Sequence, residues 1–271
     1  MNTPTSHTHL RLNGQPIADS ETSNLAFGGF AHFTSIQIRN KKIKGLGLHL
    51  ERLKQASQKL YGYALSNDTV QTYIRSSIEQ GTEDQSLTIT MFSPNGEFTA
   101  SSMNITPSVL IKSSAPEQGP SGSLTLSVIN HERPLAEIKH VGEIGKTYYL
   151  HQAIKRGFDD AVFMNNTGHL SEGTIWNLAF WDGKTVIWPK ANMLRGTMMS
   201  IVQRQLSDLN IPQRHEYITL ARLSDLKGAA VMNSWTPGVC VSKINSTFLP
   251  DSILLTALLH KAYNKEPAIN P

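Results

Sequence analysis

The stretch 133–188 constrains the fold of this chain most strongly, because its pattern changes from a segment of helical length to short strand-like runs. The helical segment follows Lys139 and ends at Arg156, because Gly157 stops it. The apolar runs 161–164 and 178–181 come next, separated by a turn that contains a glycine. A helix followed at once by strands predicts a mixed architecture of α-helices and β-sheet.

The rest of the chain repeats this mixture. Leu50, Leu53, Ala56 and Leu60 have the spacing of one helix face, whereas 33–39 alternates apolar and polar residues as a strand does. We expect helices at 48–60, 69–79, in the segment that ends at 156, and at 197–209 and 253–263, and strands at 33–39, 86–92, 108–112, 123–128, 161–164, 178–181, 229–233 and 239–244.

A segment rich in proline, glycine and serine, 113–122, is the best candidate for a linker. It predicts a smaller N-terminal α/β domain at 1–112 and a larger C-terminal domain at 123–271. The expected fold class is therefore α/β (α+β), with two unequal domains and a ligand cleft between them.

Composition excludes several classes of protein. Hydrophobic residues make up 39% and charged residues 17% of the chain, which favours a folded core over disorder. The single cysteine, Cys240, can form neither an internal disulfide nor a zinc cluster, so we expect a reducing compartment. No apolar run has the length of a membrane span and no signal peptide is recognisable. We expect a cytoplasmic protein that does not bind membranes.

The net charge of +4 raises the question of nucleic-acid binding. The only dense basic cluster is 39–44, where Asn40 and the flanking Ile38 and Ile43 favour a hairpin turn with solvated lysines. A nucleic-acid footprint covers a face rather than a turn, so we do not expect a nucleic-acid partner. A small anionic substrate suits the same charge better.

Lys139 and Glu172 are the residues with the clearest chemical potential. Lys139 closes a short apolar run, and Glu172 follows 33 residues later beside a glycine and hydroxyl side chains. Such an amine can form a Schiff base with an aldehyde cofactor, and such an acid can keep a pyridine nitrogen protonated. The alternative for Lys139 is an ordinary solvent-exposed lysine. Gly196 and Thr197 open an expected helix whose free N–H groups favour an anion, although such helix starts are common.

These motifs together resemble the fold-type IV pyridoxal-phosphate enzymes, the class IV aminotransferase family. It includes branched-chain and D-amino-acid aminotransferases and 4-amino-4-deoxychorismate lyase. The resemblance covers nearly the full chain and implies pyridoxal 5′-phosphate in the cleft between two domains, a small anionic substrate with an amino group, and a homodimer. The matching motifs are HLERL (49–53), IK (138–139), GFDDA (157–161), SEG (171–173) with Asn177, LRGT (194–197) and NS (233–234).

The resemblance also implies roles for individual residues. Lys139 would hold the cofactor and move the substrate proton. Lys146 is its rival, but Lys139 lies 18 residues before Gly157, as the family's segment requires, and Lys146 only 11. Glu172 would pair with the ring nitrogen, while Asn177 would support the turn. The residues implied as ligands of the cofactor's phosphate are Arg52, Gly196, Thr197, Met198 and Ser234 with its neighbour Asn233.

The implied reaction leans towards the lyase, which releases pyruvate from 4-amino-4-deoxychorismate and gives 4-aminobenzoate, a step of folate biosynthesis. The segment 27–34 lacks the acidic residues of the aminotransferase motif, and its Phe33-Thr34 resembles the lyase, with Thr34 helping to place a proton or the leaving group. The motif SEGT at 171–174 is closer to the aminotransferases. An aminotransferase of D-amino or branched-chain amino acids therefore stays open, as does a binding protein without turnover.

Overall fold

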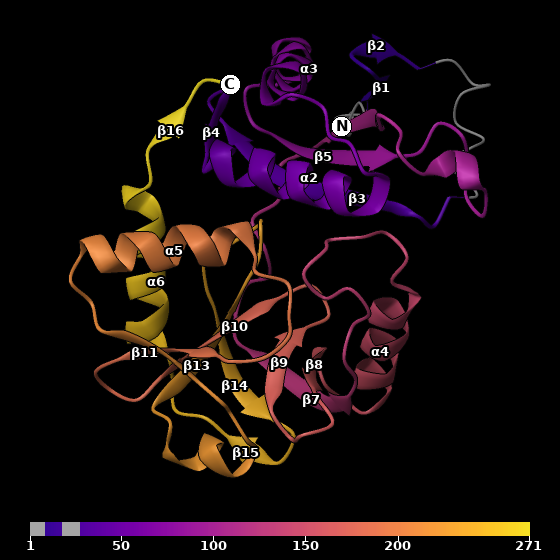
Figure 1. Cartoon of the computed structure of the whole chain (residues 1–271). Coiled ribbons are helices and arrows are strands. Elements are labelled where there is room, and N and C mark those ends of the chain that lie inside the picture. The colour runs from indigo at the N-terminus through magenta and orange to yellow at the C-terminus, as the bar shows by residue number, and fades with distance from the viewer. Residues whose placement is uncertain (1–8, 18–27) are drawn as a thin grey trace, which may run out of the picture. The chain divides into compact units, whose positions relative to one another are not determined.

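The computed structural model describes residues 9–17 and 28–271 (Figure 1). Its contacts divide the chain into two compact units, which we call unit 1 and unit 2. Unit 1 contains Met1–Glu117, Ile138–Gly142 and Pro267–Pro271, and unit 2 contains Gln118–Glu137 and Glu143–Glu266. One cut at the expected linker does not describe this division, because two short segments from later in the chain belong to unit 1.

Unit 1 is built on a seven-stranded sheet in the part of the chain that is described, with the order β16-β4-β3-β5-β6-β1-β2. Apolar residues of β3, β5 and β6 alternate with polar ones, and those of one face pack against α2 and α3 to form a single core. The elements are β1 (His9–Leu12), β2 (Gln15–Pro16), β3 (Ala31–Arg39), β4 (Lys42–Lys44), α2 (Leu46–Tyr61), α3 (Asn67–Gln80), β5 (Gln85–Phe92), η2 (Ala100–Ser102), β6 (Ser108–Ser114) and β16 (Ala268–Ile269).

The basic cluster at 39–44 is the predicted hairpin. Arg39 pairs with Lys42, and the two residues between them, Asn40 and Lys41, have positive φ angles of 50° and 59°. Two such residues form the turn that matches the twist of a β-hairpin. The side chains of Lys41 and Lys42 are exposed.

Two histidines, His32 of β3 and His49 of α2, are buried in unit 1 where the helix packs on the sheet. His32 Nε2 lies 2.9 Å from the Ser57 hydroxyl, and His49 Nδ1 lies 2.7 Å from the Thr34 hydroxyl. Burial lowers the pKa of His32 to about 4. Burial, helped by the charge of Arg52, lowers the pKa of His49 to about 3. Both rings are therefore neutral at pH 7.

The strands of unit 2 close into a ring. β9 pairs with both β8 and β10, so the path β10-β13-β14-β7-β8-β9 returns to its start. The elements are β7 (Leu124–Asn130), α4 (Ile144–Lys155), β8 (Asp160–Met164), β9 (Leu170–Gly173), β10 (Asn177–Trp181), β11 (Val186–Pro189), α5 (Thr197–Asp208), β12 (Gln213–Glu216), η3 (Ala221–Asp225), β13 (Gly228–Met232), β14 (Val239–Ile244), β15 (Thr247–Phe248) and α6 (Ile253–Lys265).

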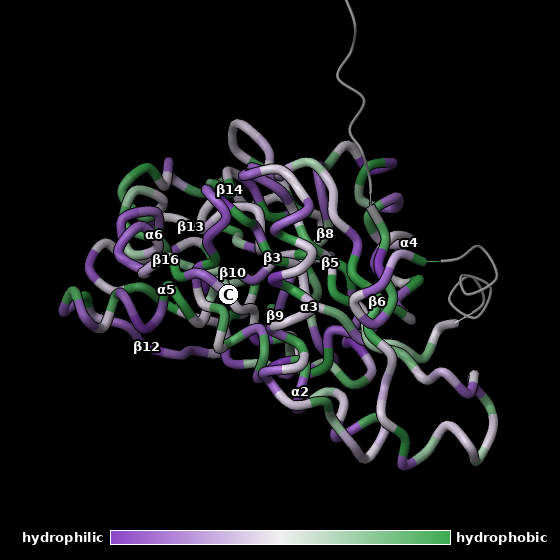
Figure 2. Tube along the Cα trace, turned by 90° about the horizontal axis from the view of Figure 1, so that it is seen from above, coloured by the Kyte–Doolittle hydropathy of each residue, from purple (hydrophilic) through white to green (hydrophobic). Residues whose placement is uncertain are grey.

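Alternate residues of these strands serve two cores. Leu178, Phe180 and Val231 belong to one apolar cluster, whereas the intervening Ala179 and Ala230 pack with residues of α5 and α6. This alternation fixes the register of β10 and β13, because a shift by one residue would exchange the two cores. The hydropathy colouring of Figure 2 shows apolar and polar residues alternating along α5 as well.

The helices and strands expected from the sequence are confirmed, with small shifts at their ends. The largest shift concerns the segment after Lys139. α4 begins only at Ile144, because 138–142 pairs with the beginning of β3 instead. Within the described residues, the structure contains no helix that is both long and apolar enough to cross a membrane.

The buried histidines make unit 1 sensitive to acid. The unfolded chain binds protons at both rings near pH 6.5, whereas the folded chain does so only near pH 4 and 3. The free energy of unfolding should therefore fall as the pH drops from about 6.5 to 4, by roughly 3 kcal/mol for each histidine. Urea unfolding at pH 7 and pH 4.5 measures this loss.

The variant His49→Gln, which cannot titrate, should lose less stability than the wild type between these two pH values. His151→Gln, which changes an exposed histidine of α4, is the control and should keep the wild-type dependence. If all three proteins lost the same free energy of unfolding between pH 7 and pH 4.5, the acid sensitivity would not come from the buried histidines.

Candidate functional site

Several expected site residues of unit 2 meet at one end of the strand ring. Glu172 of β9 is the pairing partner of Asn177, the first residue of β10. Asn177 in turn pairs with Met232, the last residue of β13, so the following Asn233 and Ser234 lie at the same end. We call this end of the ring the barrel end.

Glu172 is a buried carboxylate at the barrel end, with only 4% of its surface exposed. Its Oε1 lies 3.1 Å from a guanidinium nitrogen of Arg133 and 3.4 Å from the backbone nitrogen of Leu194. Burial raises the pKa of Glu172, and the positive charges of Arg133 and Lys146 oppose this rise. The pairing with Arg133 offsets part of the cost of holding this carboxylate out of water.

Arg133 links Glu172 to a second carboxylate and a second amine. Its Nε donates to Glu143 Oε1 at 2.6 Å, and Lys146 Nζ lies 2.6 Å from Glu143 Oε2. Burial and the nearby charge of Arg133 lower the pKa of Lys146 to about 8, against the effect of Glu172. The structure thus places Lys146, the rival lysine, in the same charged cluster as Glu172.

The expected phosphate-binding helix start is held by Asn177. Its side-chain oxygen accepts from Gly196 N at 3.0 Å, and its amide nitrogen donates to Leu194 O at 2.7 Å. A Cβ at Gly196 would lie only 2.1 Å from the Asn177 oxygen, so this backbone approach requires glycine. No side chain of the described residues caps α5, which leaves the first N–H groups of the helix, at Thr197 and Met198, for another acceptor.

Asn233 and Ser234 form the turn that follows β13. Asn233 N donates to Thr236 O at 3.1 Å, and the Asn233 side-chain oxygen accepts from Trp235 N at 2.9 Å. Asn233 therefore shapes the loop with its own side chain. Ser234 is half-buried at the tip of this turn.

Lys139 lies in unit 1, on a short segment that pairs with β3. Phe33 N donates to Lys139 O at 2.8 Å, and Val141 N donates to Ala31 O at 2.8 Å. The ammonium of Lys139 lies over the ring of Phe33, 4.7 Å from its centroid. The reactive end of Lys139 is therefore on the Phe33 face of the sheet.

Thr34 does not fit the role expected from the sequence. Its side chain points to the opposite face from Phe33, is fully buried, and pairs with His49 of α2. Ser35, the residue after Thr34 in β3, shares the face of Phe33. Alternation along the expected strand 33–39 places Phe33 and Thr34 on opposite faces, but only the packing of α2 decides which face is buried.

Arg52 lies on α2, one turn beyond His49, and is half-buried. Burial lowers the pKa of Arg52 to about 10, so the side chain remains a cation at neutral pH. It can serve as an anion ligand of unit 1.

The sequence analysis missed Arg133 and Glu143. Neither residue stands in a recognisable motif, and only the folded chain brings them to Glu172 and Lys146. A buried carboxylate needs a cation, but the sequence offers many candidates for it.

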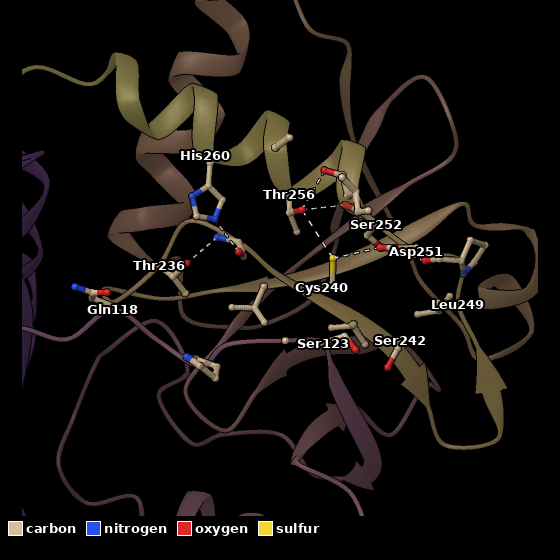
Figure 3. Close-up of a pocket in the computed structure, with 18 residues that line it drawn as sticks. Gln118, Ser123, Thr236, Cys240, Ser242, Leu249, Asp251, Ser252, Thr256 and His260 are labelled. Atoms are coloured by element: carbon tan, nitrogen blue, oxygen red, sulfur yellow. Dashed lines mark hydrogen bonds between the residues drawn. The ribbon is translucent and has the colours of Figure 1, made fainter.

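An open cavity of about 860 Å³ lies elsewhere in unit 2, between β14 and the start of α6 (Figure 3). Cys240, Asp251 and His260 line it together with apolar residues, and His260 Nε2 lies 2.9 Å from Gly238 O. The cavity contains neither a lysine nor an arginine and shares no lining residue with the expected site. Across residues 9–17 and 28–271, no group of three or more His, Cys, Asp or Glu residues is arranged to hold a metal ion.

The turn that positions Glu172 and Asn177 depends on Asp160. This buried carboxylate accepts from the Thr174 hydroxyl at 2.7 Å, from Trp176 Nε1 at 2.8 Å and from Ala161 N at 2.6 Å. Asp160→Ala should leave these donors unpaired and lower the free energy of unfolding by about 3 kcal/mol. Chemical denaturation measures the effect. Asp208→Ala, at an exposed position of α5, is the control and should change stability by less than about 0.5 kcal/mol.

Solved structures of other proteins share this fold. A branched-chain aminotransferase of Thermoproteus uzoniensis is 19% identical, with 96% of this chain and 94% of that chain covered and a TM-score of 0.81. A Legionella pneumophila protein, provisionally ascribed 4-amino-4-deoxychorismate lyase activity, is 19% identical, with 93% and 95% covered and a TM-score of 0.79. The Escherichia coli branched-chain aminotransferase is 14% identical, with 94% and 93% covered and a TM-score of 0.80.

These similarities confirm the predicted fold class, that of the fold-type IV enzymes. No curated protein matches the sequence. The model of the family described as amino-transferase class IV matches residues 31–244, which is most of the chain. This span contains every expected site residue, from Thr34 to Ser234. The chain therefore belongs to the class IV aminotransferases, a family of enzymes that use pyridoxal phosphate.

Proposed function

We propose that this protein binds pyridoxal 5′-phosphate and acts as a lyase on 4-amino-4-deoxychorismate, releasing pyruvate and 4-aminobenzoate. The proposal rests on the arrangement of residues at the barrel end. There, the buried pair of Glu172 and Arg133 lies beside the uncapped first turn of α5, to which Glu172 is connected through Leu194 N.

The described residues fit this cofactor chemically. A buried carboxylate suits a protonated ring nitrogen, and helix N–H groups behind a glycine that admits no Cβ suit a phosphate. When bound, the cofactor would supply an electron sink for the carbon that carries the substrate's amine.

Each residue of the proposed site has a separate task. Glu172, held by Arg133, would accept a hydrogen bond from the ring N–H. Thr197 and Met198 would donate backbone N–H groups to the phosphate, with Ser234 and Arg52 as further ligands. Lys139 would remove the proton from the amine-bearing carbon and return it at a later stage.

The choice of the lyase rests on the residues near Lys139. The face of the sheet that carries Phe33 presents hydroxyl side chains, among them Ser35 and Thr88. These suit a polar substrate better than an aliphatic one. An aminotransferase of D-amino or branched-chain amino acids is the second candidate, since structures of branched-chain aminotransferases share the fold.

The partners of the protein are part of the proposal. The family resemblance supports a small anionic substrate with an amino group, a homodimer and a cytoplasmic location. Size-exclusion chromatography with light scattering tests the homodimer directly.

The absorption spectrum of the purified protein tests the cofactor and the central lysine together. We expect a visible band that borohydride abolishes, with the reduced pyridoxyl group on the peptide that contains Lys139. An adduct on Lys146 would support the cofactor but would make Lys146, not Lys139, the lysine that holds it. Absence of a band, even after pyridoxal phosphate is added, would exclude the proposal.

Product analysis then separates the two reactions. A lyase should form pyruvate and 4-aminobenzoate from 4-amino-4-deoxychorismate without an amino acceptor. A strict requirement for a keto acid would instead identify an aminotransferase.

Gly196→Ala tests the phosphate end of the site. The new Cβ would collide with the Asn177 oxygen, so the start of α5 must move. We expect cofactor affinity to fall by about tenfold or more, since contacts to a phosphate dianion are strong and depend on geometry. Equilibrium dialysis against pyridoxal phosphate measures it. Gly47→Ala, which meets no atom within 4 Å, is the matched control and should retain affinity.

A further inference from the structure

One face of the unit 1 sheet carries the amine of Lys139 and is distinct from the face that packs on the helices. His32 and Thr34 of β3 contact α2, so the alternate residues Phe33 and Ser35 point away from it. The ammonium of Lys139 lies over the ring of Phe33. We call this side of the sheet the open face.

The strand register aligns three side chains in a row on the open face. Ser35 of β3 is opposite Thr88 of β5, and Thr88 is opposite Lys112 of β6. Residues that are directly opposite in an antiparallel sheet share a face, with Cα atoms about 4.5–5.5 Å apart. The row therefore places two hydroxyl groups and one ammonium next to one another.

These three side chains are available to a ligand. Ser35 and Thr88 are partly exposed and Lys112 is exposed. Within the described parts of the chain, none of the three makes a side-chain hydrogen bond or ion pair. The hydroxyl groups can donate to an oxygen, and the lysine can supply a charge and further donors.

The charge of the open face favours an anion. Its strand residues include the cations Arg39, Lys42 and Lys112, whereas β3, β4, β5 and β6 contain no aspartate or glutamate at all. Positively charged strand residues attract an anion and raise its local concentration.

The row is also close to Lys139. Ser35 is two residues from Phe33 along β3, a separation of about 7 Å. A substrate whose amine-bearing carbon lies at Lys139 could therefore extend its far end over Ser35 and Thr88, towards the side chain of Lys112.

We infer that the row Ser35, Thr88 and Lys112 binds a second carboxylate of the amino substrate, several bonds away from its amine. The inference rests on the proposed function and specifies its substrate class. 4-Amino-4-deoxychorismate belongs to this class, because its ring carboxylate lies across the ring from its amine. Branched-chain amino acids do not.

The first experiment compares glutamate with glutamine, which have the same shape but differ in charge. Each is added as both enantiomers to the holoenzyme, and the change of the visible cofactor band gives the apparent affinity. The wild type should prefer glutamate by about tenfold or more, as expected for a charge-assisted contact. Thr88→Val, of nearly equal size, and Lys112→Gln should each remove most of this preference.

Lys42→Gln is the matched control, because it removes one positive charge from an exposed position of the same face but outside the row. It should keep the preference for glutamate within about twofold, since an exposed charge at a distance is screened by salt. If Lys42→Gln and Lys112→Gln lost the preference for glutamate equally, the row would not be the binding site. Only a general effect of positive charge would remain. A wild type that prefers glutamine would also contradict the inference that the row binds a carboxylate.

A second experiment separates a failure of the row from a failure of the proposed function. Isothermal titration with glutarate, which has no amine, measures carboxylate binding without any reaction. We expect heat of binding in the wild type and in Lys42→Gln, and about tenfold weaker binding in Lys112→Gln. Equal binding in all three proteins would exclude the row even if the protein shows no response to any amine.

Discussion

The ion pair between Glu172 and Arg133 is the interaction on which the barrel end depends. Both side chains are almost completely buried, and each would be costly to bury without the other. Arg133 also donates to Ala136 O at 3.0 Å, so the same guanidinium ties the segment before Lys139 to the strand ring. One buried cation thus holds the carboxylate and shapes the chain that leads to the lysine.

Around this pair, polar side chains determine where the backbone runs. Asn177 fixes the loop before α5 through two hydrogen bonds, and Asp160 fixes the turn between β9 and β10 through two side chains. Buried polar groups of this kind cost free energy unless every partner is in place. They therefore specify one geometry for the barrel end, which apolar packing alone would not select.

The sequence predicted much of this arrangement because its signals are local. Helical spacing located α2, the basic hairpin was recognised by Asn40 between apolar neighbours, and Glu172, Asn177 and Gly196 were expected at the site. It failed where a role depends on distant residues. Thr34 was given a part in the reaction, yet its hydroxyl is used by His49, and Arg133 and Glu143 gave no local signal.

The sequence by itself determined the elements, the fold class and the family, because periodicity, glycine positions and ordered motifs are written along the chain. Only the tertiary structure decided which face each strand residue occupies and which charges meet. The register of β3, β5 and β6 aligned Ser35, Thr88 and Lys112, which are far apart in sequence. The physical reason is that hydrogen-bonded pairing and burial are properties of the folded chain, so residues without a local pattern acquire their neighbours only when the sheet and ring close.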